Sequence, residues 1–171
     1  MITDGIITLR APEPSDVDAM YVWENDVTLW SEGVLRAPTS RKLLHDFVTF
    51  YNPDPAVTGQ LRLVIELGST QEAIGCVDLY DYDCVNRRAG VGIVIGREHQ
   101  GRGYAKRAIE LLSRYCAEQL GLHQLWAIAG RENRRSIHLF DTCGFKTCGS
   151  LRGWVRKGPR YTDALMFQLV F

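Results

Sequence analysis

Apolar and polar residues recur along the chain with two distinct periods, and the order of these stretches predicts a mixed α/β protein. Apolar residues at every second position indicate strands, and apolar residues three and four positions apart indicate amphipathic helices. The predicted strands are residues 6–10, 60–67, 73–81, 89–95, 125–129, 147–155 and 161–171. The predicted helices cover residues 15–25, with Ser15 as N-cap, 40–51, 103–120 and 133–142.

The order of these elements, β-α-α-β-β-β-α-β-α-β-β, predicts about seven strands in one sheet and four helices. Strand 89–95 (A-G-V-G-I-V-I) is apolar almost throughout, which indicates burial on both faces and a central position. The strand, helix and strand between residues 89 and 129 require a right-handed crossover and therefore one parallel pairing. We expect an α/β (α+β) fold with a mixed, mostly antiparallel, twisted sheet.

Length and composition favour a single domain over residues 1–171. The chain of 171 residues contains no repeat or linker-like segment, and the proline-rich stretch 51–57 is expected to be a short loop. Its 46% hydrophobic and 23% charged residues exclude intrinsic disorder. No apolar run approaches the roughly 20 residues that cross a bilayer. The acidic start of the chain does not resemble a signal peptide, so we expect a cytoplasmic protein.

The net charge is zero, which argues against nonspecific binding to nucleic acid or to an anionic membrane. The charges are nevertheless unevenly distributed along the chain. Residues 1–85 contain 5 basic and 14 acidic residues, a net charge of −9, and residues 86–171 contain 15 and 6, a net charge of +9. Two halves that interleave in space would hide this difference. Otherwise the first half favours a cationic ligand and the second a polyanionic one.

Cysteine and histidine spacing argues against a disulfide framework and against a metal site. The five cysteines are odd in number and contain no C-x-x-C, and the four histidines contain no H-E-x-x-H. We expect reduced cysteines, most of them acting as small apolar residues, and no bound metal.

The clearest chemical signal is the hexapeptide 100–105 (Q-G-R-G-Y-A), between an apolar strand and an amphipathic helix. Its glycines allow the backbone to approach a ligand, and the unpaired amides at the start of a helix attract an anion. Lys106 breaks the dinucleotide fingerprint G-x-G-x-x-G, and the G-K-S/T of a P-loop is absent. The loop therefore predicts a diphosphate site without a nicotinamide cofactor or nucleotide hydrolysis. A plain turn is the alternative.

This hexapeptide resembles the Q/R-x-x-G-x-G/A motif of the GNAT superfamily of acyl-CoA-dependent N-acetyltransferases, with Gln100, Gly103 and Ala105 at its fixed positions. Residues 133–145 (N-R-R-S-I-H-L-F-D-T-C-G-F) resemble the family's second motif, N-x-x-S/A-x-x-L/I-Y-x-x-x-G-F, except at Phe140. The family's order of elements matches the predicted one, so the resemblance covers essentially the whole chain. Softer matches at residues 9–16, 74–79, 86–89 and 158–163 resemble the branch of spermidine N-acetyltransferases and ribosomal-protein N-terminal acetyltransferases.

The resemblance implies acetyl-CoA as co-substrate, held in a V-shaped opening where strand 89–95 parts from strand 125–129. It implies that backbone groups of the first strand pair with pantetheine, and that the pyrophosphate lies on the glycine loop. A helix N-cap explains Asn133 equally well. The implied acetyl-CoA-binding residues are Ile93, Val94, Ile95, Gln100, Gly101, Arg102, Gly103, Tyr104, Ala105, Lys106, Asn133 and Ser136.

The implied reaction is attack of a neutral primary amine on the thioester, after the ammonium has lost its proton to a carboxylate or histidine through water. Family members often protonate the departing thiolate with a tyrosine, and Phe140 occupies that position and cannot donate. We expect Asp81 to serve as the base. Cys143, Tyr161 or water are the alternatives for the proton donor.

Acidic residues at the end of strand 73–81 indicate the amine side of the site. Strand alternation predicts that Asp81 and Asp83 lie on the face opposite Asp78. Together with Glu32 they are the candidate substrate-binding residues, and as a cluster they favour a polyamine such as spermidine. Surface acids that end a strand are the alternative.

We therefore expect an acetyl-CoA-dependent N-acetyltransferase whose partner is a small-molecule amine. A ribosomal-type protein N-terminal acetyltransferase, and a non-catalytic acyl-CoA-binding regulator, are the alternatives. Assembly into a homo-oligomer is left open by the sequence.

Overall fold

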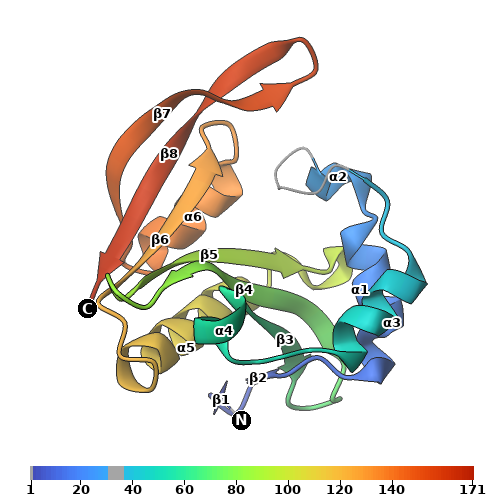
Figure 1. Ribbon diagram of the computed structural model, residues 1–171. Helices are drawn as coiled ribbons and strands as arrows, with labels where there is room; N and C mark the ends of the chain where they lie inside the picture. Colours follow the sequence, from blue (N-terminus) through green and yellow to red (C-terminus); the bar gives the residue numbers. More distant parts are fainter. Residues whose placement is uncertain (1, 31–36) are drawn as a thin grey trace.

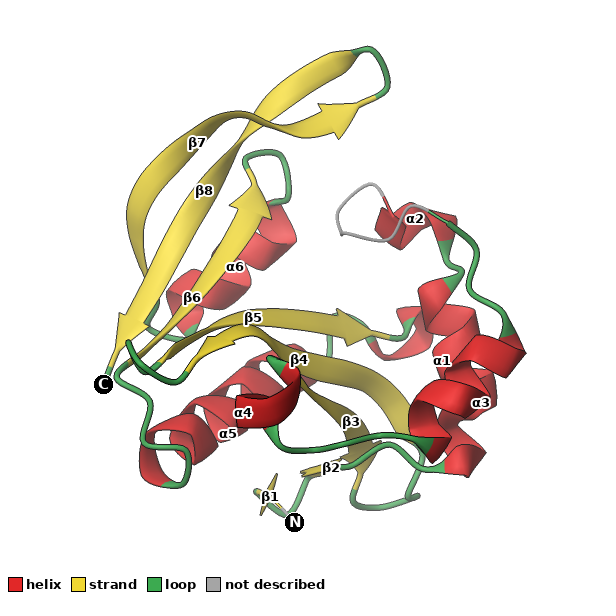
Figure 2. Ribbon diagram, viewed as in Figure 1, coloured by secondary structure: helices red, strands yellow, loops and turns green. Residues whose placement is uncertain are grey.

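The computed structural model describes residues 2–30 and 37–171, and its described strands form one eight-stranded sheet with helices on both faces (Figure 1; Figure 2). The strand order is β1-β2-β3-β4-β5-β6-β8-β7. All neighbours are antiparallel except β5 and β6, which are parallel. The strands are β1 (Ile2–Thr3), β2 (Ile7–Arg10), β3 (Leu61–Leu67), β4 (Ala73–Asp83), β5 (Arg88–Ile95), β6 (Gln124–Gly130), β7 (Lys146–Lys157) and β8 (Arg160–Val170).

Four of the described helices are longer than two turns, and they follow the predicted order. They are α1 (Val17–Glu24), α3 (Arg41–Thr49), α5 (Tyr104–Glu118) and α6 (Arg134–Thr142). Two single-turn helices, α2 (Val27–Trp30) and α4 (Pro55–Thr58), and the 3₁₀ helix η2 (Arg97–His99) lie between them, and a second 3₁₀ helix, η1 (Pro14–Asp16), precedes α1. The predicted fold class is confirmed, with one strand more than expected because β1 is a separate two-residue strand.

Two local predictions were wrong. Ser15 is not an N-cap, because Pro14 starts a 3₁₀ turn in which Glu13 and Asp16 form a reciprocal capping box. The stretch 51–57 is not wholly a loop, because Asp54 caps α4 by accepting a hydrogen bond from the backbone N–H of Ala56. In both cases a proline at the first helical position favours the helical turn.

The two faces of the sheet differ, and we name each by a helix that packs against it. The α5 face is covered by α5 and α6 and holds the main apolar core, in which Leu79 and Leu125 are fully buried. The α1 face lies under α1 and α3, which bury a smaller cluster around Met20 and Leu44. Since side chains alternate along a strand, each strand contributes to both faces.

Arg62 on β3 links α1 to the α1 face of the sheet. Its guanidinium pairs with Asp78 of β4 through two hydrogen bonds of 2.8 and 2.9 Å, and with Glu24 of α1 at 2.6 Å. The hydroxyl of Tyr51 also bonds to both backbone groups of Arg62. The end of α1 is therefore fixed over the start of β3 and the middle of β4.

Candidate active site

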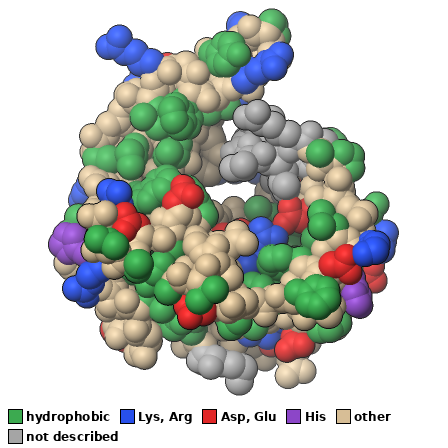
Figure 3. Space-filling model, viewed as in Figure 1, with side chains coloured by type: hydrophobic (Ala, Val, Ile, Leu, Met, Phe, Trp, Pro, Cys, Tyr) green, Lys and Arg blue, Asp and Glu red, His purple; other side chains and the backbone are tan. Residues whose placement is uncertain are grey.

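Strands β5 and β6 part after three residue pairs, which opens the sheet. The parallel pairs are Arg88 with Gln124, Ala89 with Leu125 and Gly90 with Trp126. Beyond them β5 continues to Ile95 and pairs only with β4, and β6 continues to Gly130 and pairs only with β8. One edge of the second half of β5 therefore has no strand partner. Figure 3 shows the molecule hollowed between the part that carries β6 to β8 and the part that carries α1 and α3.

The predicted anion site lies just past the end of β5, at the start of α5. Gly101 and Gly103 have φ angles of 75° and 83°, a region that glycine enters without strain. A β-carbon at either position would have no neighbour within 4 Å, so the space beside the loop is open. Gly103 is the N-cap of α5 and no side chain caps the helix. Its first amides are therefore available to an anion.

Gln100 holds the loop, the end of β5 and α6 together. Its side-chain N–H donates to the carbonyl of Ile95 at 3.0 Å, and its side-chain oxygen accepts from Arg135 at 3.1 Å. A glutamine can do both because its amide carries a donor and an acceptor. One of the backbone groups expected to meet pantetheine thus already has a partner.

Asn133 is the N-cap of α6, and its side-chain oxygen accepts from the backbone N–H of Ser136 at 3.0 Å. The structure therefore gives this asparagine a capping role, worth about 1 kcal/mol in comparable helices. Arg102 and Lys106 are exposed beside the loop, and Lys106 lies 3.7 Å from Glu110.

The three residues expected near the departing thiolate lie in different surroundings. Phe140 is 4% exposed and packs in the α5-face core against Phe145 and Phe167, with ring centres 5.2 and 5.8 Å away. Cys143 ends α6, with its sulfur 3.9 Å from the carbonyl oxygen of Lys106. Burial, together with Glu110, raises the pKa of this thiol to about 11, so it is protonated at neutral pH.

Tyr161 is not brought near these two residues. It lies on the β7–β8 hairpin three residues outside the last β6–β8 pair, Gly130 with Ala164, and is 65% exposed (Figure 1). Figure 1 shows that this part of the hairpin projects beyond the rest of the sheet.

Comparison with known proteins agrees with this geometry. Residues 7–146 match the acetyltransferase (GNAT) domain model. The chain belongs to the GNAT acetyltransferase family. It is 30% identical to the spermidine N(1)-acetyltransferase of Vibrio cholerae, covering 92% of this chain and 88% of the relative. It is 38% identical to the Escherichia coli spermidine N(1)-acetyltransferase over 61% of this chain and 55% of the relative.

Two solved structures of the Vibrio cholerae spermidine N-acetyltransferase, each 27% identical, have the same fold. One, in complex with CoA and spermine, matches with a TM-score of 0.85 over 98% of this chain and 96% of that chain. The other, a dodecamer, matches with a TM-score of 0.79 over 98% and 95%. These similarities identify the chain as an N-acetyltransferase, and GNAT enzymes take the acetyl group from acetyl-CoA.

A bulge in β4 changes where the acidic residues of this acetyltransferase point. Tyr80 is opposite Gly90, and the next pair is Asp83 with Arg88, so β4 carries one more residue than β5 in this interval. Asp81 takes a φ of 48° within the bulge. The extra residue shifts the alternation by one position, so Asp83 lies on the same face as Asp78. The prediction of opposite faces was wrong for this reason.

Two of the predicted substrate-binding acids already have basic partners. Asp78 is paired with Arg62, and Asp83 lies 3.2 Å from Arg88. Hydrogen bonds from Asn86, and the nearby Arg88, hold the pKa of Asp83 below its ordinary value. Asp81 makes no ion pair with any residue that the structure describes. Glu32 lies outside the described residues.

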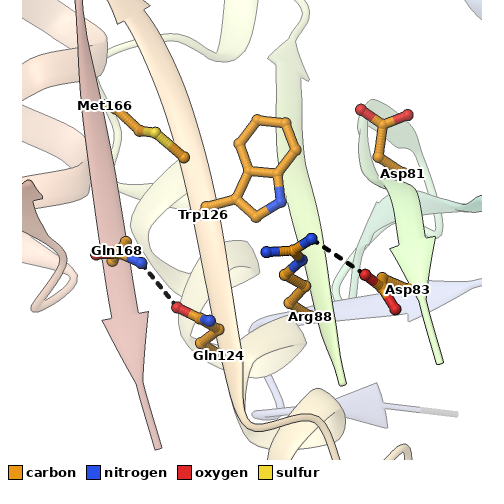
Figure 4. A pocket seen from close by; sticks show the side chains of 7 residues that line it. All are labelled: Asp81, Asp83, Arg88, Gln124, Trp126, Met166 and Gln168. Carbon is orange, nitrogen blue, oxygen red and sulfur yellow. Dashed lines mark hydrogen bonds and ion pairs between the residues drawn. The ribbon is translucent and has the colours of Figure 1, made fainter. Parts of the chain in front are cut away.

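Asp81 and Asp83 line a pocket of about 400 Å³ on the α1 face (Figure 4). The pocket crosses β4, β5, β6 and β8, and Trp126 stands at its centre between Met166 and the two aspartates. Gln124 and Gln168 join across its other end by a hydrogen bond of 2.8 Å. The lining residues are Asp81, Asp83, Arg88, Gln124, Trp126, Met166 and Gln168.

Tyr80 and Trp126 are site residues that the sequence analysis missed. Their rings meet edge to face, with centres 5.0 Å apart and planes at 83°. Burial, with a smaller effect of Asp81, raises the pKa of Tyr80 to about 12. The available signal was the pair of glycines at 90 and 92 inside a buried strand, since such glycines mark a close approach of other groups.

Metal and membrane features are absent from the described part of the chain. Its histidine, cysteine and carboxylate side chains form no group of three that could hold a metal ion. Within residues 2–30 and 37–171, no helix is both long and apolar enough to span a bilayer.

Proposed function

We propose that this GNAT enzyme transfers an acetyl group from acetyl-CoA to a primary amine of a polyamine such as spermidine. The observation that carries the proposal is the opening between β5 and β6. It runs from an uncapped helix start to the point where the two strands converge, and a pocket with a free carboxylate lies over that convergence. The identity to two spermidine N(1)-acetyltransferases supports the choice of amine.

In this proposal acetyl-CoA binds along the free edge of β5. Backbone groups of Ile93 and Val94 pair with the pantetheine arm in place of a neighbouring strand. The pyrophosphate lies on the amides of residues 101–105, where the helix dipole favours negative charge and Arg102 and Lys106 add positive charge.

The amine approaches from the α1 face, where the acidic residues lie. An ammonium group loses a proton to water held by Asp81, and the nitrogen lone pair then forms a bond to the thioester carbon. The nitrogen releases its second proton to water and the carbon–sulfur bond breaks as the tetrahedral intermediate collapses, giving an N-acetyl amine and a CoA thiolate. We propose that the thiolate takes its proton from water, since Phe140 cannot donate and the Cys143 thiol donates toward a backbone carbonyl.

The pairing of Asp78 and Asp83 limits the charge argument for a polyamine. Only Asp81 offers an unpaired negative charge among the described residues of the pocket, where a cluster of acids was expected. Peptide amines, the substrates of the ribosomal-type alternative, therefore belong in the same test. Assembly into an oligomer is a further part of the proposal, supported by the dodecameric relative.

Release of free thiol from acetyl-CoA tests the function directly. The amines to compare are spermidine, spermine, an aminoglycoside and short peptides with free N-termini. We expect the highest kcat/KM with spermidine or spermine. Preference for a peptide would move the assignment to protein N-termini, and no turnover with any amine would contradict the proposed substrate class.

A further inference from the structure

The point where β5 and β6 part is closed on the α1 face by two aromatic rings. A β-carbon at Gly90 would lie 2.5 and 2.6 Å from ring atoms of Tyr80 and 2.8 Å from the indole of Trp126. Such distances are shorter than van der Waals contact, so the rings rest directly on the backbone of Gly90. A β-carbon at Gly92 would lie 3.8 Å from the nearest atom of the Tyr80 ring, so this ring covers β5 from residue 90 to residue 92.

The opposite face of the same point is filled by the core. Ala89 and Leu125 form the adjacent residue pair, and both side chains have no exposed surface. These residues belong to the apolar cluster under α5. The opening between β5 and β6 therefore narrows to a closed end, bounded by the core on one side and by Tyr80 and Trp126 on the other.

The direction of the donor in this opening follows from the proposed function, on which this inference rests. The pyrophosphate lies at the loop beyond Ile95, and the strands converge at Gly90 and Trp126. The pantetheine arm therefore runs from the loop toward the convergence. The acyl group is attached to the far end of that arm, so any lengthening of the acyl chain extends it toward the closed end.

We propose that Tyr80 and Trp126 form an aromatic stop that restricts the donor to a short acyl group and so selects acetyl-CoA over longer acyl-CoAs. The indole of Trp126 stands in the middle of the pocket of about 400 Å³ that lies over this closed end (Figure 4). Truncating the indole enlarges the space at the closed end. A longer acyl chain then has space to enter beside Met166.

The test is the ratio of kcat/KM for hexanoyl-CoA to that for acetyl-CoA, measured with the best amine of the screen. One methylene group in a tight apolar pocket changes kcat/KM by about 10- to 200-fold. We expect the ratio to rise at least about tenfold in Trp126→Ala and in Tyr80→Ala. A purely structural role would lower both rates together and leave the ratio unchanged.

Two controls separate the stop from other effects. Tyr80→Phe keeps the ring over Gly90 and should keep the wild-type ratio, whereas a hydroxyl-dependent role would change it. Trp154→Ala removes an indole that is 60% exposed on the β7–β8 hairpin and should also keep the ratio.

Calorimetric titration of hexanoyl-CoA and acetyl-CoA without an amine keeps the test independent of the acceptor. If the proposed polyamine activity fails but both truncations gain affinity for hexanoyl-CoA at least about tenfold relative to acetyl-CoA, the stop stands. The inference is overturned if folded variants keep the wild-type ratios of rate and affinity. It is also overturned if the wild-type enzyme uses hexanoyl-CoA as well as acetyl-CoA.

Discussion

Asp81 shows how one backbone angle changes what a side chain can reach. Regular alternation along β4 would have placed Asp81 and Asp83 on the face opposite Asp78, but the bulge lets both line the pocket on the α1 face. The two differ in their partners, because Asp83 is held by Arg88 and Asn86 and Asp81 is not. The binding of a cationic group in the pocket should therefore depend mainly on Asp81.

We expect Asp81→Asn to lower kcat with every amine, because Asp81 holds the proposed base. We also expect the apparent KM for spermidine to rise about two- to fivefold, as the loss of one solvent-exposed charge pair would cause. Asparagine tolerates a positive φ, so the bulge is kept. The effect should shrink between 0.1 and 1 M salt, where the screening length falls from about 10 to about 3 Å. The measurement is steady-state kinetics with spermidine and with a monoamine.

Asp83→Asn is the matched control for this substitution, because its carboxylate already has a cationic partner. Equal rises in KM for Asp81→Asn and Asp83→Asn, or an equal rise in KM with the monoamine, would remove the polyamine argument.

Phe140 occupies the position where a tyrosine is typical, inside an aromatic cluster. We expect Phe140→Tyr to increase turnover, because general acid catalysis contributes about 10²- to 10⁴-fold and no side chain is assigned to protonate the thiolate. The measurement is kcat beside that of Cys143→Ala. An unchanged kcat, together with a loss of about 1–3 kcal/mol in unfolding free energy, would show that the hydroxyl is buried in the core without a partner.

At the scale of elements, the start of α5 carries the donor site. Gly103→Glu places a side chain and a negative charge where the proposal puts the pyrophosphate, against the helix dipole. We expect affinity for acetyl-CoA, measured by calorimetry, to fall at least about tenfold, or about 1.4 kcal/mol.

Gly59→Glu controls for the backbone strain in that experiment. Gly59 ends α4 with a φ of 74° and has the same open surroundings as Gly103. Its replacement should lower stability to a similar extent without weakening acetyl-CoA binding. If the two variants bind acetyl-CoA equally well, the α5 loop is not a phosphate site.

The ion pairs of Arg62 join α1 to the sheet, and their removal should lower the stability of the protein. Arg62→Met leaves Asp78, at 24% exposure, without the guanidinium that it pairs with, and removes one partner of Glu24. We expect a loss of about 2 kcal/mol in unfolding free energy by denaturant titration, somewhat less than for a fully buried pair. Lys42→Met breaks an exposed pair with Asp46 and should cost less than 1 kcal/mol. Similar losses in both would contradict the structural role of Arg62.

The elements that the sequence predicted well are those defined by local periodicity and by short motifs. Strand β5, helices α5 and α6 and the glycine loop fall within a few residues of their predicted bounds. The bulge at Asp81, the Arg62 pairs and the contact of Tyr80 with Trp126 were not predicted. Each depends on residues that meet only across the sheet, which a periodic pattern along one strand does not encode.

At the scale of the whole molecule, the uneven charge of the chain is also uneven in space. The strands of residues 1–85, β1 to β4, occupy one side of the sheet, and β5 to β8 occupy the other. The acidic half, residues 1–85, and the basic half, residues 86–171, are therefore largely separate in the sheet, although α5 of the basic half packs against β2 of the acidic half. Ion pairs such as Asp4 with Arg107 and Asp26 with Arg97 join the acidic half to the basic half.

Only three residue pairs, between β5 and β6, join the two parts of the sheet, β1 to β5 and β6 to β8. An acyl-CoA that pairs with the free edge of β5 would take the place of a neighbouring strand and would stabilise the contact between these two parts of the sheet. Ligand that binds only the folded state adds about 2.7 kcal/mol to the unfolding free energy at a concentration one hundred times its Kd. The resistance of this enzyme to unfolding would then follow the supply of acyl-CoA in the cell, so that metabolic state and protein lifetime become coupled.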